Sequence, residues 1–292
     1  MRKGSSKMPR TADKKDIFID TFIKAALLED IGPGDNTSCY IISPEKQGEA
    51  TVLAKENLIL SGTRASKQVF ASLDAEIRMK QYYEDGASVS SGEVILSIEG
   101  KLRPILAGER VALNFLQHLS GIASFTRKFV SAVEGFPVTI VDTRKTTPLW
   151  RSLEKEAVQH GGGKNHRFGL FDGILIKDNH IAAAGGVEQA VSLVKERVSH
   201  LLKIEIEVEN LSDLHQAIEA GADVVLLDNM SPEEIKEAVS FSQGKVILEA
   251  SGGINLQNIR QFASTGVDII SIGALTHSAP AVDMSLEINL VK

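Results

Sequence analysis

Short runs of β-branched and aliphatic residues alternate with helix-like segments between residues 138 and 277. The runs are VTIVD, GILIK, LKIEIEV, DVVLLD, KVILEA and VDIISIG. Segments such as VEQAVSLVKERV and SPEEIKEAVSFS separate them and place apolar residues at helical spacing. One strand and one helix in every roughly 20 to 35 residues is typical of right-handed β-α-β units. Strands this apolar favour a parallel sheet covered by helices, so this region predicts an α/β fold.

The ends of these strands favour a barrel over an open doubly wound sheet, although both fit the alternation. Barrel enzymes collect their chemistry at the rim that the strand ends form, and late loops of a barrel often bind phosphate. The polar and glycine residues at the strand ends are Asp142, Arg144, Lys177, Glu207, Asp228, Glu249, Ser251-Gly252-Gly253, and Gly273 followed by Thr276. No GxGxxG motif follows an early strand, so a dinucleotide site of the Rossmann kind is unsupported.

The first hundred residues have a different pattern. Residues 17–28 and TRASKQVFASL show helical spacing, whereas EATVLAKENLILSG and EIRMKQYYEDGASVSSGEVILSIEGK indicate short strands separated by turns. One or two helices among several short strands predict a small α+β domain that ends near Gly100. Beyond it we expect one helix from Pro104 to Leu119 and a second from Ala123 to Val133.

Composition excludes several classes of protein. The net charge is -6, and the only basic patch of the kind a nucleic-acid binder carries is the tail MRKGSSKMPR, which reads as a disordered start. No apolar run approaches the ~18 residues that a membrane helix needs. Cys39 is the only cysteine, which excludes intrachain disulfides and thiolate zinc sites. We expect a soluble cytoplasmic protein that binds neither nucleic acid nor membranes.

Basic residues of this acidic chain gather in one loop-rich stretch, residues 143–181. It contains Arg144, Lys145, His166, Arg167 and Lys177. Arginine presents a planar fork that fits a carboxylate or phosphate, so several such cations predict a small, highly anionic ligand. Two plainer interpretations stay open, because exposed cations are usually solvated and His166 is equally consistent with a histidine satisfied inside the core.

The same stretch predicts a helix after TRKTTP, with Leu149, Leu153, Ala157 and Val158 on its apolar face. The triple glycine 161–163 is expected to end that helix. The segment 178–180, Asp-Asn-His, either contributes to the site or caps the helix that follows it.

Acidic residues end two consecutive strands, at Glu207 and Asp228. Magnesium prefers oxygen ligands and commonly joins one or two carboxylates to a phosphate, so we expect these residues to hold Mg²⁺ directly or through water. The alternative is a pair of rim carboxylates that hold lysines in place. Glu205 and Glu209 share the strand parity of Glu207, and spacing alone does not choose among the three. No GxSxG or Walker A motif occurs, so the site is suited to stabilising charge rather than to covalent catalysis.

Six motifs in register resemble the quinolinate phosphoribosyltransferase family. They are TRKTTP, GGGKNHRFGLFDGILIKDNH, EIEVEN, VVLLDN, EASGGI and SIGALTH. The similarity extends to EDIGPGDNTS and LAGERVALNFLQHLSGIAS and covers nearly the whole chain after about Ile17. The resemblance implies an N-terminal α+β sandwich domain followed by an incomplete, open α/β barrel. We therefore divide the chain into a tail at 1–16, the sandwich domain at 17–103, the barrel with the active site at 104–277, and a segment at 278–292 that returns to the N-terminal domain.

The resemblance also implies an activity, a cofactor and partners. The enzyme would transfer a phosphoribosyl group from phosphoribosyl pyrophosphate to quinolinate with decarboxylation, using Mg²⁺, in de novo NAD biosynthesis. It would act as a homodimer whose N-terminal domains cover the partner's barrel. The quinolinate site would comprise Arg110 reaching in from the partner chain, Thr143, Arg144, His166, Arg167 and Lys177. Phosphoribosyl pyrophosphate would bind to Lys145, Glu207 and Asp228, which would be the catalytic residues. It would also contact the loops Ser251-Gly252-Gly253 and Ile272-Gly273-Ala274. Glu207 and Asp228 would hold the metal, directly or through water.

The chain departs from the family pattern after TRKTTP, where a glycine is common and this sequence has Leu149 and Trp150. The nearest alternative function is another phosphoribosyltransferase of similar fold that uses nicotinate or a different anionic ring without decarboxylation. A non-catalytic protein that keeps the anion pocket is a second alternative. Retention of Lys145 with both metal-type carboxylates favours the enzyme.

Overall fold

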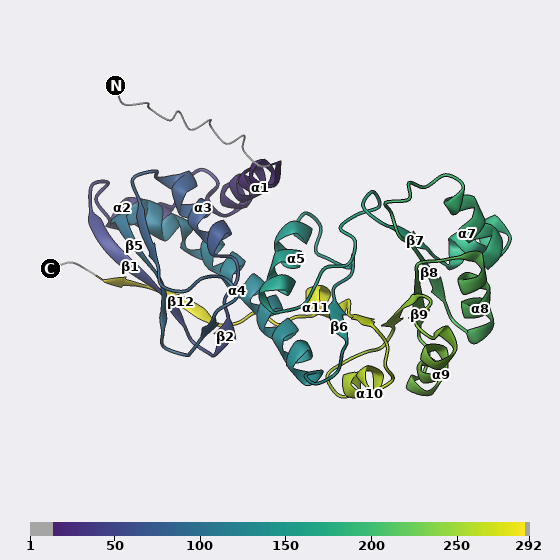
Figure 1. Ribbon diagram of the computed structural model, residues 1–292. Helices are drawn as coiled ribbons and strands as arrows, with labels where there is room; N and C mark the ends of the chain where they lie inside the picture. The colour runs from purple at the N-terminus through teal and green to yellow at the C-terminus, as the bar shows by residue number, and fades with distance from the viewer. Residues whose placement is uncertain (1–13, 290–292) are drawn as a thin grey trace, which may run out of the picture.

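The structure, a computed structural model, describes residues 14–289 and consists of a smaller mixed domain and a barrel-like domain joined by a long helix (Figure 1). Most of the predicted tail, up to residue 13, lies outside the described residues, and residues 14–16 belong to the first helix. Residues 290–292 of the predicted C-terminal segment also lie outside them.

The N-terminal domain is built on an antiparallel sheet in the order β12-β1-β5-β3, beside a small pair of strands, β2 and β4. Burial alternates along β1, where Ala50, Val52 and Ala54 face the core, because successive side chains of a strand point to opposite faces. The elements are α1 (Lys14–Ile31), α2 (Asn36–Ile41), β1 (Gln47–Ala54), β2 (Leu58–Ile59), α3 (Thr63–Leu73), β3 (Arg78–Gln81), β4 (Ser88–Val89) and β5 (Val94–Lys101). The predicted α+β character is confirmed.

A single helix, α4 (Leu102–Ala132), replaces the two helices that the sequence predicted here. Gly121, between the two predicted helices, lies inside the single helix, where an added Cβ would come 2.2 Å from the carbonyl oxygen of Pro280. Glycine at this position therefore permits the returning C-terminal chain to pass close to α4 and does not end the helix. The helix packs on α3 in one domain and on α5 in the other.

The second domain carries six parallel strands in the order β6-β11-β10-β9-β8-β7. β6 and β7 are the two ends of this sheet, so the barrel is open between them, as the resemblance implied. Its elements are β6 (Thr139–Val141), α5 (Arg151–His160), β7 (Ile174–Ile176), α6 (Asp178–Ala184), α7 (Val187–Lys195), β8 (Ile204–Val208), α8 (Leu211–Ala220), β9 (Val224–Asp228), α9 (Pro232–Ser242), β10 (Ile247–Ser251), α10 (Ile259–Ala263), β11 (Ile269–Ser271) and α11 (Ala274–His277).

The C-terminal strand β12 (Met284–Asn289) pairs antiparallel with β1, so the chain ends inside the first domain (Figure 1). The predicted domain boundary near residue 104 stays a prediction, because α4 runs through it without interruption. Within residues 14–289, no helix has the length and hydropathy needed to cross a membrane.

Candidate active site

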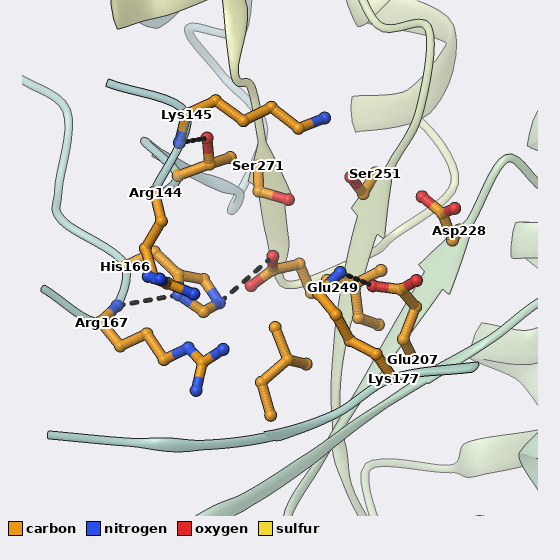
Figure 2. Close-up of a pocket in the computed structure, with 13 residues that line it drawn as sticks. Arg144, Lys145, His166, Arg167, Lys177, Glu207, Asp228, Glu249, Ser251 and Ser271 are labelled. Carbon is orange, nitrogen blue, oxygen red and sulfur yellow. Dashed lines mark hydrogen bonds and ion pairs between the residues drawn. The ribbon is translucent and has the colours of Figure 1, made fainter. Parts of the chain in front are cut away.

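A cavity of about 390 Å³ lies at the carboxyl ends of the parallel strands, where the sequence placed the site. Figure 2 shows Arg144 and Arg167 on one side of it and Glu207 and Asp228 on the other. Its lining includes nine of the predicted residues: Thr143, Arg144, Lys145, His166, Arg167, Lys177, Glu207, Asp228 and Ser251. Because parallel strands end at one edge, side chains as far apart in the chain as Thr143 and Ser271 meet here.

The loop that carries Arg144 and Lys145 is held by the helix that follows it. Glu154 of α5 is fully buried, accepts a hydrogen bond from the Thr147 amide at 3.1 Å and lies 2.9 Å from Nε2 of His118 on α4. Trp150 stacks on Phe115 with ring centroids 4.7 Å apart. The tertiary structure thus fixes the loop against the long helix.

The prediction that Leu149 lies on the apolar face of this helix is wrong. The helix begins at Arg151, and Leu149 is 63% exposed with a φ angle of 68°. Trp150 supplies the apolar anchor instead, which leaves Leu149 to adopt the left-handed conformation at the point where the family commonly has glycine.

The two arginines of the cavity are held close together. Arg167 donates from Nη1 to the carbonyl oxygen of Gly173 at 3.0 Å, while the Nε atoms of Arg144 and Arg167 are buried and lack a hydrogen-bond partner among the described residues. Burial and the neighbouring Arg144 lower the pKa of Arg167. A guanidinium stays charged at neutral pH even so. Two adjacent guanidinium groups that line one cavity favour an anionic ligand there.

His166 is engaged on both of its ring nitrogens. Nδ1 accepts a hydrogen bond from the Arg167 amide at 2.8 Å, and Nε2 lies 3.0 Å from Oε2 of Glu205. Burial lowers the pKa of His166, and the hydrogen bond to Glu205 together with the charges of Glu205 and Glu249 raises it further than burial lowers it. Because Nδ1 already accepts a hydrogen bond, the ring proton in this geometry is on Nε2. Both ring nitrogens of His166 therefore have partners inside the protein, as one of the two interpretations predicted, and the ring also lines the cavity.

His166, Glu205 and Glu249 bring three potential ligand atoms within 4.8 Å of one another. Their spacing alone would suit a metal ion, yet the hydrogen bond from the Arg167 amide to Nδ1 leaves the ring proton on Nε2. An imidazole nitrogen must offer a lone pair to bind a metal, so the donor set does not fit one in this conformation.

Glu249 lies on the floor of the cavity and was not assigned to the site from the sequence, although it was noted as a strand end. Burial, and then repulsion from Glu205, raise the pKa of Glu249 to about 7. Ser271, at the end of β11, lines the cavity as well, and its buried hydroxyl lies next to Glu249, whose pKa it lowers. A serine at a strand end gives no sequence signal that separates it from a core serine.

Glu207 is the acid of β8 that faces the cavity, which resolves the choice among three glutamates. Its Oε2 lies 2.5 Å from Nζ of Lys177, while Glu205 is buried beside His166 and Glu209 is exposed. Asp228 ends β9 and accepts from the side-chain amide of Asn229 at 2.7 Å. Two neighbouring carboxylates with free oxygens are a donor set that suits Mg²⁺ bridged to a phosphate.

The segment after Lys177 caps a helix. The ring Nδ1 of His180 accepts a hydrogen bond from the Lys177 amide at 2.9 Å, and Asp178 accepts from the Asn179 amide at 2.7 Å. None of the residues 178–180 lines the cavity among the described residues, so the capping interpretation holds.

Ser251 of the predicted phosphate loops lines the cavity. The amide of Ile272 donates to the carbonyl oxygen of Val141 at 3.0 Å, and the assignment of Ile272 to phosphoribosyl pyrophosphate stays a prediction. Gly252, with φ at +98°, lets the backbone pass Asn229, and Gly273 lets it pass the side chain of Lys145. Contacts of Gly252, Gly253, Gly273 and Ala274 with phosphate stay predictions.

Arg110 is exposed on α4 and is not part of the cavity lining in the described chain. It was assigned to the site of a partner chain, and one chain alone does not test that assignment.

Comparison with known proteins decides the family. Models of the quinolinate phosphoribosyl transferase N-terminal and C-terminal domains match residues 35–120 and 122–287. The chain belongs to this family. It is 44% identical over 263 residues to a probable nicotinate-nucleotide pyrophosphorylase (carboxylating) of Bacillus subtilis, covering 90% of this chain and 91% of that one.

Other members of the family are similar over comparable lengths. A quinolinate phosphoribosyltransferase (decarboxylating) of Nicotiana tabacum is 38% identical over 286 residues, which are 91% of this chain and 81% of that one. The structure of nicotinate-nucleotide pyrophosphorylase from Francisella tularensis superimposes with a TM-score of 0.91 at 41% identity, covering 97% of this chain and 98% of that one. Family membership therefore extends over both domains and the site.

Proposed function

We propose that this chain joins quinolinate to phosphoribosyl pyrophosphate and releases pyrophosphate and carbon dioxide, forming nicotinate mononucleotide for de novo NAD biosynthesis. The observation that carries the proposal is the arrangement of Arg144, Arg167 and Lys177 around one cavity that also holds Glu207 and Asp228. A dianionic ring needs several cations, and a pyrophosphate donor needs acidic residues that manage a metal. The family's named members carry this activity.

Quinolinate binds on the basic side of the cavity in this proposal. The guanidinium groups of Arg144 and Arg167 bind its carboxylates, with Lys177 as a third cation and Thr143 beside them. His166 forms a wall of this half-site and keeps Arg167 in place through the Arg167 amide, since both of its ring nitrogens are engaged inside the protein.

The ring nitrogen attacks the anomeric carbon of the ribose as the carbon–oxygen bond to pyrophosphate breaks. Positive charge develops on the sugar and negative charge on the leaving group, and Lys145 stabilises the latter. A fixed charge aimed at developing charge contributes about 3 kcal/mol. The alkylated, cationic ring then accepts the electron pair of the bond to the 2-carboxylate, so carbon dioxide leaves without an enzymic base. A proton from solvent completes the product at that carbon.

Mg²⁺ is the cofactor that we propose for the acidic side. Glu207 and Asp228 would hold it, directly or through water, and it would supply positive charge to the pyrophosphate. Glu207 and Asp228 would also accept hydrogen bonds from the ribose hydroxyls of the bound donor.

We further propose a homodimer in which Arg110 of one chain completes the quinolinate site of the other. The support is that Arg110 is exposed on a helix that spans both domains and has no role in the cavity of its own chain. Equilibrium sedimentation that finds only monomers at assay concentration would contradict this arrangement.

A cytoplasmic location is the last part of the proposal. Its support is the lone cysteine, which gives the fold no disulfide to depend on, as is usual in reducing compartments. Cell fractionation that recovers the chain from an oxidising compartment would contradict it.

The test of the proposed function is a product assay with purified protein. Phosphoribosyl pyrophosphate and Mg²⁺ are supplied with either quinolinate or nicotinate, and products are separated by chromatography. We expect nicotinate mononucleotide from quinolinate only, and loss of product when a chelator removes the metal. Turnover with nicotinate alone would support the related enzyme class, and no turnover with either ring would support a binding protein.

A further inference from the structure

Lys155 is a lysine inside the protein core, on a face of α5 that the proposed mechanism does not use. Its side chain is 3% exposed, and that of Asp142, to which its Nζ donates, is fully buried. Burial raises the pKa of Asp142 and lowers that of Lys155, in each case against the attraction of the partner. Burying such a pair is costly, and a buried ion pair is weak evidence for a stabilising role. The presence of this buried pair therefore needs an explanation other than stability.

The pair connects the two loops that carry the cations of the cavity. Asp142 directly precedes the loop with Arg144 and Lys145, and its Oδ1 accepts from the amide of His166 at 2.9 Å. Nζ of Lys155 donates to the carbonyl oxygen of His166 at 3.0 Å. The side-chain amide of Asn165, in the orientation that satisfies its hydrogen bonds, donates to Oδ2 of Asp142 at 2.7 Å.

These contacts lie at the open seam of the barrel. β6 and β7 are not paired with each other, because they form the two ends of the six-stranded sheet. In the described residues, the segment before His166 contacts β6 through one parallel bridge, between Val141 and Lys164. One bridge holds the backbone only at Val141 and Lys164. The contacts of Asp142 and Lys155 with His166 hold the two segments together beyond it, as backbone hydrogen bonds between paired strands do elsewhere in the sheet.

We propose that Lys155 and Asp142 are positioning residues that set the distance between the Arg144 loop and the His166–Arg167 segment, and so determine affinity for the two adjacent carboxylates of the acceptor ring. This inference rests on the proposed function, because it takes the ligand of the two arginines to be quinolinate. Neither residue lines the cavity among the described residues, so both act through the backbone of the loops.

Loss of the Asp142–Lys155 pair should weaken binding of quinolinate and leave binding of phosphoribosyl pyrophosphate nearly unchanged. Lys145, the residue proposed for pyrophosphate, has an anchor of its own: Thr276 donates from Oγ1 to the carbonyl oxygen of Lys145 at 2.7 Å. Glu207 and Asp228 belong to strands that are paired on both sides. Loss of the buried pair therefore loosens the His166–Arg167 segment and leaves the donor side of the cavity in place.

The experiment uses the full-length double variant Asp142→Asn/Lys155→Met, which replaces the charged pair by neutral side chains of similar size. Lys155→Met alone is compared with it, since that variant leaves Asp142 as a buried charge without its partner. Glu156→Gln, on the same helix and part of an exposed-side contact with Arg64, is the matched control. For each variant the KM of quinolinate, the KM of phosphoribosyl pyrophosphate and the melting temperature are measured. Direct binding of benzene-1,2-dicarboxylate, which has the two carboxylates but no ring nitrogen to react, is measured by calorimetry.

We expect the folded double variant to raise the KM of quinolinate and the Kd of the dicarboxylate at least tenfold, with the KM of phosphoribosyl pyrophosphate within about threefold of the wild type. The control should match the wild type in all of these. Unchanged affinity for the dicarboxylate in a folded double variant would overturn the proposal, and so would a parallel loss for both substrates that follows a loss of stability. If the wild type binds neither quinolinate nor the dicarboxylate, the proposed function fails instead, whatever the variants do.

Discussion

Lys177 and Glu207, assigned to two different substrates, form an ion pair with Nζ 2.5 Å from Oε2. The side chain of Lys177 is 45% exposed and that of Glu207 is 15% exposed. In the proposed mechanism, a metal-bound pyrophosphate that engages Glu207 would compete with Lys177 for the same carboxylate. Donor binding would then free Lys177 to face the acceptor ring, which makes the two half-sites energetically dependent on each other.

Glu207→Gln should tighten binding of an acceptor-like dianion while it impairs turnover. A partly exposed ion pair is worth up to about 1 kcal/mol, so release of Lys177 should lower the Kd of benzene-1,2-dicarboxylate by up to roughly fivefold. The kcat should fall because the proposed site for phosphoribosyl pyrophosphate loses the Glu207 carboxylate. Calorimetry with the unreactive dicarboxylate checks the first effect independently of activity, and weaker binding in Glu207→Gln would contradict the competition.

Arg144→Ala and Lys177→Ala should each lower kcat/KM for quinolinate at least tenfold, about 1.4 kcal/mol of transition-state stabilisation. Each substitution removes a cation that lines the cavity. Arg197→Ala, an exposed arginine in the same domain, is the control and should be neutral. Steady-state kinetics on folded proteins decide the matter, and wild-type values for either cavity variant reject that residue's assignment.

Mixing Arg110→Ala chains with Arg167→Ala chains should restore part of the activity that each lacks alone. A heterodimer would contain one site with both arginines intact, if Arg110 acts in the partner's cavity. The measurement is activity after co-refolding, with the heterodimers verified by tagged purification. Verified heterodimers that remain as inactive as the parents would place Arg110 elsewhere.

The stability of Glu249→Gln relative to the wild type, measured as the difference in free energy of unfolding, should increase as the pH rises. The pKa of Glu249 is raised to about 7 in the folded chain by burial and by Glu205, whereas an unfolded glutamate titrates near 4.3. The folded state thus binds more protons between these values, and the wild type loses stability as the pH rises from about 4 to about 7, by at most about 4 kcal/mol. Glutamine lacks this titration. Melting curves of both proteins at pH 5 and pH 8 test it, and a constant difference between them would be the contrary result.

Leu149→Gly should raise the free energy of unfolding by up to about 1 kcal/mol, because Leu149 has a φ angle of 68° and loses little buried surface. Leu201→Gly is the control, being 80% exposed without a positive φ angle, and should be neutral or destabilising. Urea denaturation gives both values. Equal destabilisation by the two substitutions would show that the left-handed conformation of Leu149 carries no strain.

The regular elements could be predicted because their signals are local. The period of apolar residues located the strands and helices of the barrel, and parallel strand ends placed Arg144, Lys177, Glu207 and Asp228 at one rim. The break predicted between Leu119 and Ala123 shows where this reasoning stops, because the helix continues through Gly121, whose missing side chain makes room for Pro280, 159 positions away in the chain.

The residues that sequence reasoning missed depend on contacts that only the folded chain creates. Glu249 and Glu205 are recognisable only once β8 and β10 are placed on either side of β9 and His166 lies beside them. Lys155 reads as a surface lysine on a helix until Asp142 and His166 surround it. Ile272 was assigned to phosphoribosyl pyrophosphate through the family resemblance, and the sequence does not show that its amide donates to the carbonyl oxygen of Val141.

Labelled carbon dioxide released per nicotinate mononucleotide formed tests the central claim most directly. Quinolinate carrying ¹³C in the 2-carboxylate is turned over with phosphoribosyl pyrophosphate and Mg²⁺, and gas and nucleotide are quantified by mass spectrometry. The account predicts one labelled carbon dioxide for each nucleotide, with no label left in the product. A nucleotide that keeps the label, or carbon dioxide release that does not require phosphoribosyl pyrophosphate, would contradict it.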